Sequence, residues 1–167
     1  MRDLSLITWK EIQDVNKEKA LAFIVMAPIE EHGLCLPLAT DLIEGQAWSK
    51  AAMEELEKHH GLDCYFLPAF PIAAASVNEF YGSIHFSMKT TYEVAYEILE
   101  SIRCMGFRHI VLIASHADPD HQIAVTKAVR KVNRKNGNDF HAGWIETSSL
   151  LSINKKHVRQ GYKDLPD

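Results

Sequence analysis

Three short apolar segments that alternate with helical patterns constrain the fold of this chain more than any other feature. Residues 20–26, 63–67 and 109–114 have the length and apolar content of buried strands. Helical spacing of apolar residues fills the intervals at 41–59 and 90–106, and a third helical pattern runs from Pro119 to about residue 134. This alternation predicts an α/β fold of three layers, α/β/α, with a mainly parallel central sheet.

The size and composition of the chain narrow the classes of protein to which it can belong. Its 167 residues, 47% hydrophobic and 24% charged, predict a single domain over 1–167. The apolar stretches are too short to span a membrane and the first residues lack a signal-peptide pattern, so we expect a cytoplasmic protein without a membrane partner. The net charge of −4, with scattered basic residues, argues against a nucleic-acid partner. The three cysteines form no CxxC pair, which disfavours a disulfide framework or a cysteine-rich zinc site.

Polar residues that can bind metal ions or carry protons follow the predicted strands. They come from three segments: Glu30, Glu31, His32 and Asp41; His116 and Asp118; His141 and Glu146. Ligands of open parallel sheets bind beyond the carboxyl ends of the strands, where such loops meet. The sequence therefore predicts that these side chains converge on a cation.

Each candidate also has a simpler structural interpretation. Asp41 could cap a helix, and Glu30 could be a solvated loop charge. His116 could be a histidine whose hydrogen bonds are satisfied at a strand end, and Asp118 could cap the helix that Pro119 opens. Only their joint placement favours a functional site.

Other conspicuous residues are interpreted as structural. His121 is one of several histidines without carboxylates at suitable spacing, so we expect it at the surface or in packing. Cys35, between two leucines, is interpreted as a small apolar residue rather than a nucleophile. Trp9 and Trp48 are expected to pack against other residues.

Four segments resemble the creatininase (creatinine amidohydrolase) family. Residues 30–41, EEHGLCLPLATD, are similar to the family signature Glu-x-His-Gly followed by Leu-Pro-Leu-x-Thr-Asp. The resemblance continues in order through NEFYGSIHFS (78–87), GFRHIVLIASHAD (106–118) and HAGWIETSSLL (141–151). It covers most of the chain and implies a compact creatininase-like fold.

The resemblance also implies a site with two divalent metal ions. By motif position, Glu30 and His116 would bind one ion and His32 the other. Asp41 would bridge the two ions. Such a mixed set of oxygen and imidazole ligands suits zinc or manganese, with iron as a further option.

The remaining family positions imply the rest of the site and its reaction. Asp118 matches an acidic ligand of creatininase itself, whereas Glu146 matches the glutamate that other members use, so both are candidates for the second ion. The implied reaction is hydrolysis of a C–N bond in a small, in some cases cyclic, amide by a water that the two metal ions activate. His141 would protonate the leaving nitrogen, and Glu146, if it is not a ligand, would orient His141 or shuttle the proton.

Departures from the family pattern leave the substrate open. Cys35 replaces a usual histidine, and only 24 residues separate His116 from His141, where members carry a longer insertion with pocket-lining aromatic residues. The alternatives are a formamide deformylase or a peptidase of the same superfamily, or a catalytically silent metal-binding oligomeric relative. The resemblance further implies a homo-oligomer, with the hexamer as its family form.

Overall fold

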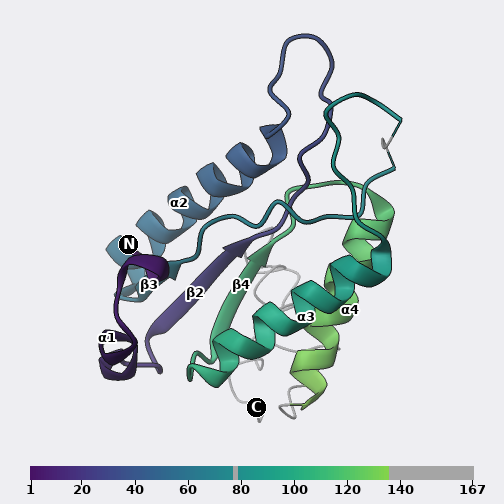
Figure 1. The fold of residues 1–167 in the computed structure, drawn as a ribbon. Helices are drawn as coiled ribbons and strands as arrows, with labels where there is room; N and C mark the ends of the chain where they lie inside the picture. The colour runs from purple at the N-terminus through teal and green to yellow at the C-terminus, as the bar shows by residue number, and fades with distance from the viewer. Residues whose placement is uncertain (77–78, 136–167) are drawn as a thin grey trace, which may run out of the picture.

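The computed structural model describes residues 1–76 and 79–135, which form a parallel sheet with helices on both faces (Figure 1). The elements are β1 (Arg2–Asp3), η1 (Leu4–Leu6), α1 (Trp9–Asp14), β2 (Ala20–Val25), α2 (Thr40–His60), β3 (Asp63–Phe66), α3 (Met88–Cys104), β4 (His109–Ile113) and α4 (Pro119–Lys135). The strand order is β1-β3-β2-β4, and every pair of neighbours is parallel. The predicted α/β fold is confirmed.

Alternate residues of each strand pack against different helices. In β2, Ala22 and Ile24 belong to a buried cluster with Leu99 of α3 and Ala128 of α4. Phe23, between them, faces the other way and packs with Met53 of α2. Successive strand residues point to opposite faces of a sheet. The alternation therefore gives three layers, with α2 on one face and α3 and α4 on the other (Figure 1).

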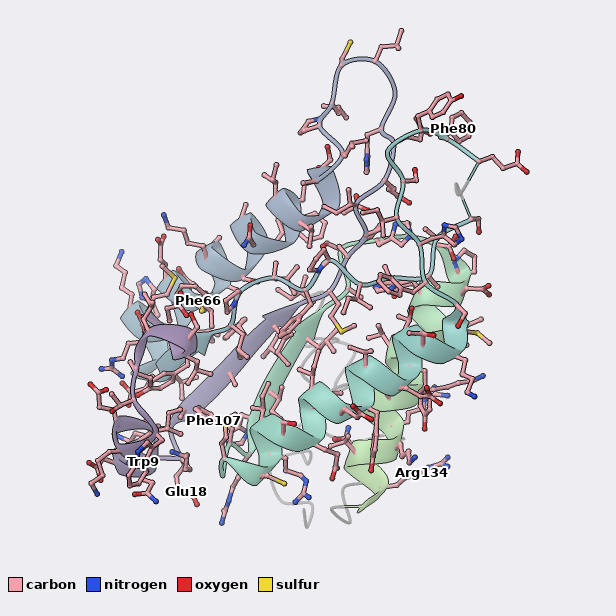
Figure 2. All side chains as sticks on the ribbon, viewed as in Figure 1. Trp9, Glu18, Phe66, Phe80, Phe107 and Arg134 are labelled. Atoms are coloured by element: carbon pink, nitrogen blue, oxygen red, sulfur yellow. The ribbon has the colours of Figure 1, made fainter. Side chains whose placement is uncertain are left out.

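The larger of the two buried clusters lies between the sheet and the pair α3 and α4. Phe107, just before β4, is 1% exposed and packs edge-on against Tyr65 of β3, with ring centres 5.6 Å apart (Figure 2). Each large apolar side chain buried in such a core contributes about 1.5–3 kcal/mol to the free energy of folding. This packing fixes the sheet on which the loops of the site are built.

The connections explain why a crevice forms between the loops after β2 and β4. From β2 the chain passes through α2 to β3 on one side, and from β3 it crosses back through α3 to β4 on the other. Right-handed connections that run in opposite directions place their helices on opposite faces. The loops after the neighbouring strands β2 and β4 consequently diverge to opposite faces. Between them lies the crevice in which open α/β sheets bind ligands.

The first elements of the chain were not predicted from the sequence. β1 adds two residues at the edge of the sheet, beside β3. Thr8 caps α1 in a capping box, because its hydroxyl accepts from the backbone N–H of Glu11 while the Glu11 carboxylate accepts from the backbone N–H of Thr8. Trp9 and Trp48, which we expected to pack against other residues, are 72% and 55% exposed.

Two further observations bear on the sequence predictions. Among the helices that the structure describes, none is long and apolar enough to cross a membrane. The segment that holds His141 and Glu146 lies outside the described residues.

Candidate metal centre

Glu30 and His32 are held in the long loop between β2 and α2. The backbone N–H of Glu30 donates to the carbonyl of Leu38 at 2.9 Å, which closes the loop. The neighbouring Ile29 accepts from the backbone N–H of Ile84 at 2.8 Å, which ties the loop to the segment before α3. His32 turns back so that its Nδ1 lies 3.0 Å from the carbonyl oxygen of Glu30. Glu30 is 7% exposed, so the alternative that it is a solvated loop charge is wrong.

Asp41 reaches the same place from the first turn of α2. Its backbone carbonyl accepts a hydrogen bond of 2.7 Å from the buried hydroxyl of Ser115, in the loop after β4. One turn later, Gly45 packs so closely on the sheet that a Cβ there would collide with Ser115 Oγ and lie 2.6 Å from Cγ1 of Val25. The absence of a side chain at 45 therefore lets α2 place Asp41 over the ends of β2 and β4. Asp41 is not the N-cap, because Ala39 holds that position.

His116 follows β4 and is fixed by the first turns of α4. The side-chain amide of Gln122 donates to the carbonyl oxygens of His116 and Ala114, the latter at 3.2 Å. The His116 ring is 9% exposed and is oriented toward the loop after β2. Neither Ser115 nor Gln122 was singled out in the sequence, because serine and glutamine give no signal of a site when read singly.

Four polar side chains converge at this edge of the sheet. One donor atom from each of Glu30, His32 and Asp41 lies within 4.8 Å of the other two. Nε2 of His32 is 2.9 Å from Oδ1 of Asp41. Nδ1 of His116 is 3.2 Å from Oε1 of Glu30 and 3.0 Å from Oδ2 of Asp41. The structure thus brings together four of the predicted metal ligands.

The donors at this site fit a divalent cation. Glu30 Oε2 and Asp41 Oδ2 are buried and form no hydrogen bond of good geometry with the described residues, although Asp41 Oδ2 lies 3.0 Å from Nδ1 of His116. A buried polar atom left unpaired costs about 1–3 kcal/mol, more when it is charged. A cation bound among two carboxylates and two imidazoles would satisfy oxygen atoms that the protein leaves unpaired. Zinc and manganese both accept this set of ligands.

The proton affinities of the site reflect burial and crowding of like charges. Burial raises the pKa of Glu30, and the nearby carboxylate of Asp41 adds to the rise, although His116 opposes it. Burial lowers the pKa of His32, but hydrogen bonds with the Glu30 carbonyl and the Asp41 carboxylate outweigh it, so the pKa is raised. Without a cation, the site therefore tends to hold protons.

Asp118 lies at the wall of the same cavity. The cavity measures about 300 Å³ and is lined by Glu30, His32, Asp41, Ser76, His116, Ala117 and Asp118. The Asp118 Oδ2 atom accepts from the N–H of Ser76 at 2.9 Å and from its hydroxyl at 2.5 Å. Its Oδ1 atom accepts from the N–H of Asp120 at 2.8 Å. The hydrogen bond from Asp120 agrees with the alternative that Asp118 caps the helix that Pro119 opens. Burial raises the pKa of Asp118, but its hydrogen bonds outweigh burial, so the pKa is lowered.

His121 lies beside this site, although its spacing in the sequence suggested only a surface or packing residue. Its side chain is fully buried, and its ring centre lies 5.4 Å from that of His116. Burial and the neighbouring His116 lower the pKa of His121 to about 4. The signal that could have revealed it is its position five residues after His116, in the first turn of the helix that follows.

Residues 5–167 match the family model described as creatininase, creatinine amidohydrolase. A search of curated proteins found no match.

Solved structures show the same fold at low sequence identity. A proposed creatinine amidohydrolase from Bacteroides fragilis is 21% identical, with a TM-score of 0.69 over 90% of this chain and 59% of its own. A creatinine amidohydrolase (creatininase) is 18% identical, with a TM-score of 0.65 over 80% of this chain and 51% of its own. A mutant creatininase of Zn-Zn type is 16% identical, with a TM-score of 0.62 and the same two coverages. The chain thus spans little more than half the length of these structures.

Proposed function

Because the chain belongs to the creatininase family, we propose that it is a metal-dependent amidohydrolase that hydrolyses the C–N bond of a small amide. The observation that carries this proposal is the convergence of Glu30, His32, Asp41 and His116 at the carboxyl edge of the sheet. Burying two carboxylates side by side is unfavourable in free energy unless a cation or protons neutralise their charges.

The proposed site holds two divalent ions. Glu30 and His116 would hold one ion, His32 would hold the other, and Asp41 would serve both. Solved creatininases of the Zn-Zn type and with Mn support zinc or manganese as the metals, with iron as a further option. Two such ions would lower the pKa of a shared water and polarise the carbonyl of the substrate.

The second ion needs a further acidic ligand, for which Asp118 and Glu146 are the candidates. Both carboxylate oxygens of Asp118 already accept hydrogen bonds, from Ser76 and from the start of α4. Binding a cation would compete with these bonds, which favours Glu146. Metal content separates the two candidates: if Glu146 is the ligand, Glu146→Gln binds one ion per chain and Asp118→Asn binds two. The reverse pattern would assign the ligand to Asp118.

The proton transfers fall to residues of the last family motif. We assign protonation of the leaving nitrogen to His141, since a positioned histidine is a common general acid near neutral pH. If Asp118 proves to be the ligand, Glu146 is free to orient His141 or to shuttle the proton. The proposal also includes a single domain over 1–167 and a homo-oligomer, for which the family precedent is a hexamer.

The substrate is proposed only as a class. A creatininase of this fold has been solved in complex with creatine, which supports a small, polar, amide-derived compound. Because residues 117–140 are fewer than in the family pattern, the amide need not be creatinine. A cavity of about 300 Å³ is the volume of a small-molecule site.

The test is turnover by purified protein loaded with zinc or manganese. Creatinine, other small cyclic amides and formamides are offered, and amine or acid release is followed by NMR. We expect hydrolysis of at least one class, abolished in Glu30→Gln and retained in Glu31→Gln, a matched change of the adjacent glutamate. Hydrolysis of formamides alone would favour the deformylase alternative. Bound metal without turnover of any amide would identify a silent relative and contradict the proposal.

A further inference from the structure

His121, in the first turn of α4, is a buried imidazole whose placement calls for an explanation. The side chain is fully buried, and neither ring nitrogen forms a hydrogen bond of good geometry among the residues that the structure describes, although the backbone of Met26 lies near the ring. Leaving a buried polar group unpaired costs about 1–3 kcal/mol. A leucine or methionine would fill such a space without this cost, so packing alone does not account for a histidine.

The neighbour of this ring is His116, which has an unpaired nitrogen of its own. Nδ1 of His116 lies beside the carboxylates of Glu30 and Asp41, whereas its Nε2 is buried without a partner. The two ring centres are 5.4 Å apart and the ring planes are tilted by 58°. One N–H···N hydrogen bond of about 3 Å, plus roughly 1 Å from each ring centre to its nitrogen, gives about 5 Å between centres. The spacing of 5.4 Å is slightly longer than this value, so a small rotation of either ring would bring the two imidazoles to hydrogen-bond distance, although no hydrogen bond joins them in the structure.

A histidine that binds a metal ion through one nitrogen almost always donates its other N–H to an acceptor. That bond fixes the tautomer and the plane of the ring. The usual acceptors are a carboxylate, a backbone carbonyl or water. In this site, Glu30 and Asp41 lie on the Nδ1 side of His116, so neither is placed to accept from Nε2.

We propose that His121 is a positioning residue that accepts the Nε2–H hydrogen bond of His116 and so leaves Nδ1 of His116 free to bind a cation. This inference rests on the proposed function. A neutral imidazole has one donor and one acceptor nitrogen, so the ring of His121 can supply the acceptor that Nε2–H of His116 lacks. Gln122, the next residue, donates to the backbone carbonyl of His116, so the start of α4 fixes both the backbone and the ring.

The test compares three variants of the full chain. His121→Leu removes the acceptor at similar volume, and His121→Gln retains an acceptor. His109→Leu is the matched control, because His109 is exposed at the opposite end of β4. Zinc affinity is measured by competition with a chromophoric chelator. We expect His121→Leu to bind zinc about 10- to 100-fold more weakly than the unmodified protein. His121→Gln should recover most of the affinity, and the control should match the unmodified protein.

A second measurement does not depend on bound metal. Long-range ¹H–¹⁵N NMR spectra of the metal-free protein report which nitrogen of His116 carries the proton. The proposal requires a proton on Nε2 of His116 in the unmodified protein, whereas Nδ1 can also donate to Glu30 and Asp41. We expect Nε2 to be protonated in the unmodified protein and to lose part of that protonation in His121→Leu.

Several results would overturn the inference. One is a neutral His116 in the unmodified protein whose proton lies on Nδ1. This measurement is independent of whether any variant folds. A second is a His121→Leu protein with unchanged zinc affinity and an unchanged His116 tautomer. A third is an equal loss of zinc affinity in His121→Leu and His121→Gln, which would mean that His121 acts only by filling space. If the unmodified protein binds no zinc, the proposed function fails. The tautomer of His116 then decides the role of His121 separately.

Discussion

Glu30 is a residue whose burial lowers the stability of the metal-free protein, although the same carboxylate is a proposed ligand of the cation. Its carboxylate is buried beside that of Asp41, and burial together with this neighbour raises its pKa. For a group whose pKa is raised on folding, stability is greatest below the unfolded pKa and falls as the pH rises through the folded pKa. At neutral pH, which lies above the unfolded pKa of Glu30, the raised pKa therefore makes the metal-free protein less stable.

Replacing this charge should accordingly stabilise the metal-free protein. We expect Glu30→Gln to raise Tm in the presence of a chelator by a few degrees. The same variant should lose most of the increase in Tm that zinc gives the unmodified protein, because binding to the native state is what produces that increase. Differential scanning calorimetry with and without zinc measures both, and Glu31→Gln serves as the control. A lower Tm of Glu30→Gln in chelator would argue against a destabilising charge.

The pKa of His121 predicts a specific pH dependence. Folding lowers the pKa of His121 from 6.5 to about 4. Between pH 6.5 and pH 4, His121 therefore takes up a proton in the unfolded chain but not in the native protein. Stability is thus unaffected by His121 above pH 6.5 and decreases as the pH falls toward 4, by up to about 3 kcal/mol. Urea denaturation of the metal-free protein and of His121→Leu should give free energies of unfolding whose difference changes by this amount. A constant difference from pH 7 to 4 would contradict the shift.

At the scale of elements, the contact between α2 and the sheet sets the geometry of the site. Gly45 is where this helix comes closest to Val25 and Ser115, and Asp41 lies one turn before it. The helix is therefore a rigid support whose distance from the sheet decides whether Asp41 reaches the other ligands.

Gly45→Ala should reverse the usual effect of this substitution. In most helix interiors alanine is more stable than glycine by about 1 kcal/mol. Here the added methyl group must displace Ser115 or Val25, so we expect a loss of about 1–3 kcal/mol in urea denaturation and weaker zinc binding. Ala47→Gly, on the exposed face of α2, controls for helix propensity. A stabilised Gly45→Ala protein with unchanged zinc affinity would show that the approach of α2 does not position Asp41.

The sequence was informative about long periodic elements and about clustered ligands. The strands at β2, β3 and β4 and the helices α2, α3 and α4 follow from apolar periodicity, because their buried faces repeat at regular spacing. β1 and α1 are short and carry little periodicity, so they were not predicted. Glu30, His32 and Asp41 were found through their motif. His121, Ser115 and Gly45 act through neighbours distant in sequence, which no local pattern reveals.

At the scale of the whole molecule, two apolar loops project beyond the carboxyl edge of the sheet (Figure 1). Leu34 and Tyr81 are fully exposed at their tips, and Phe80 is 55% exposed (Figure 2). The two loops touch, since a Cβ on Gly82 would meet the side chain of Leu38. Contiguous exposed apolar surface of this kind often marks an interface between proteins.

We therefore expect the loops to contribute to the proposed homo-oligomer. Light scattering coupled to size exclusion should give a mass that is a multiple of 18.9 kDa. The double variant Leu34→Lys and Tyr81→Lys should shift that mass toward the monomer, because charged groups are costly to bury in an apolar interface. Lys89→Ala, an exposed change elsewhere, should leave it unchanged. A monomeric unmodified protein would remove the basis for this expectation.

The metal content of the purified protein tests the central claim most directly. Elemental analysis is made on the unmodified chain, on Asp41→Ala, and on Glu44→Ala, an exposed acidic residue of the next turn of α2. The site described above predicts close to two transition-metal ions per chain, lost in Asp41→Ala and retained in Glu44→Ala. Protein that stays free of metal under metal-replete conditions would contradict the claim that these residues form a metallohydrolase site.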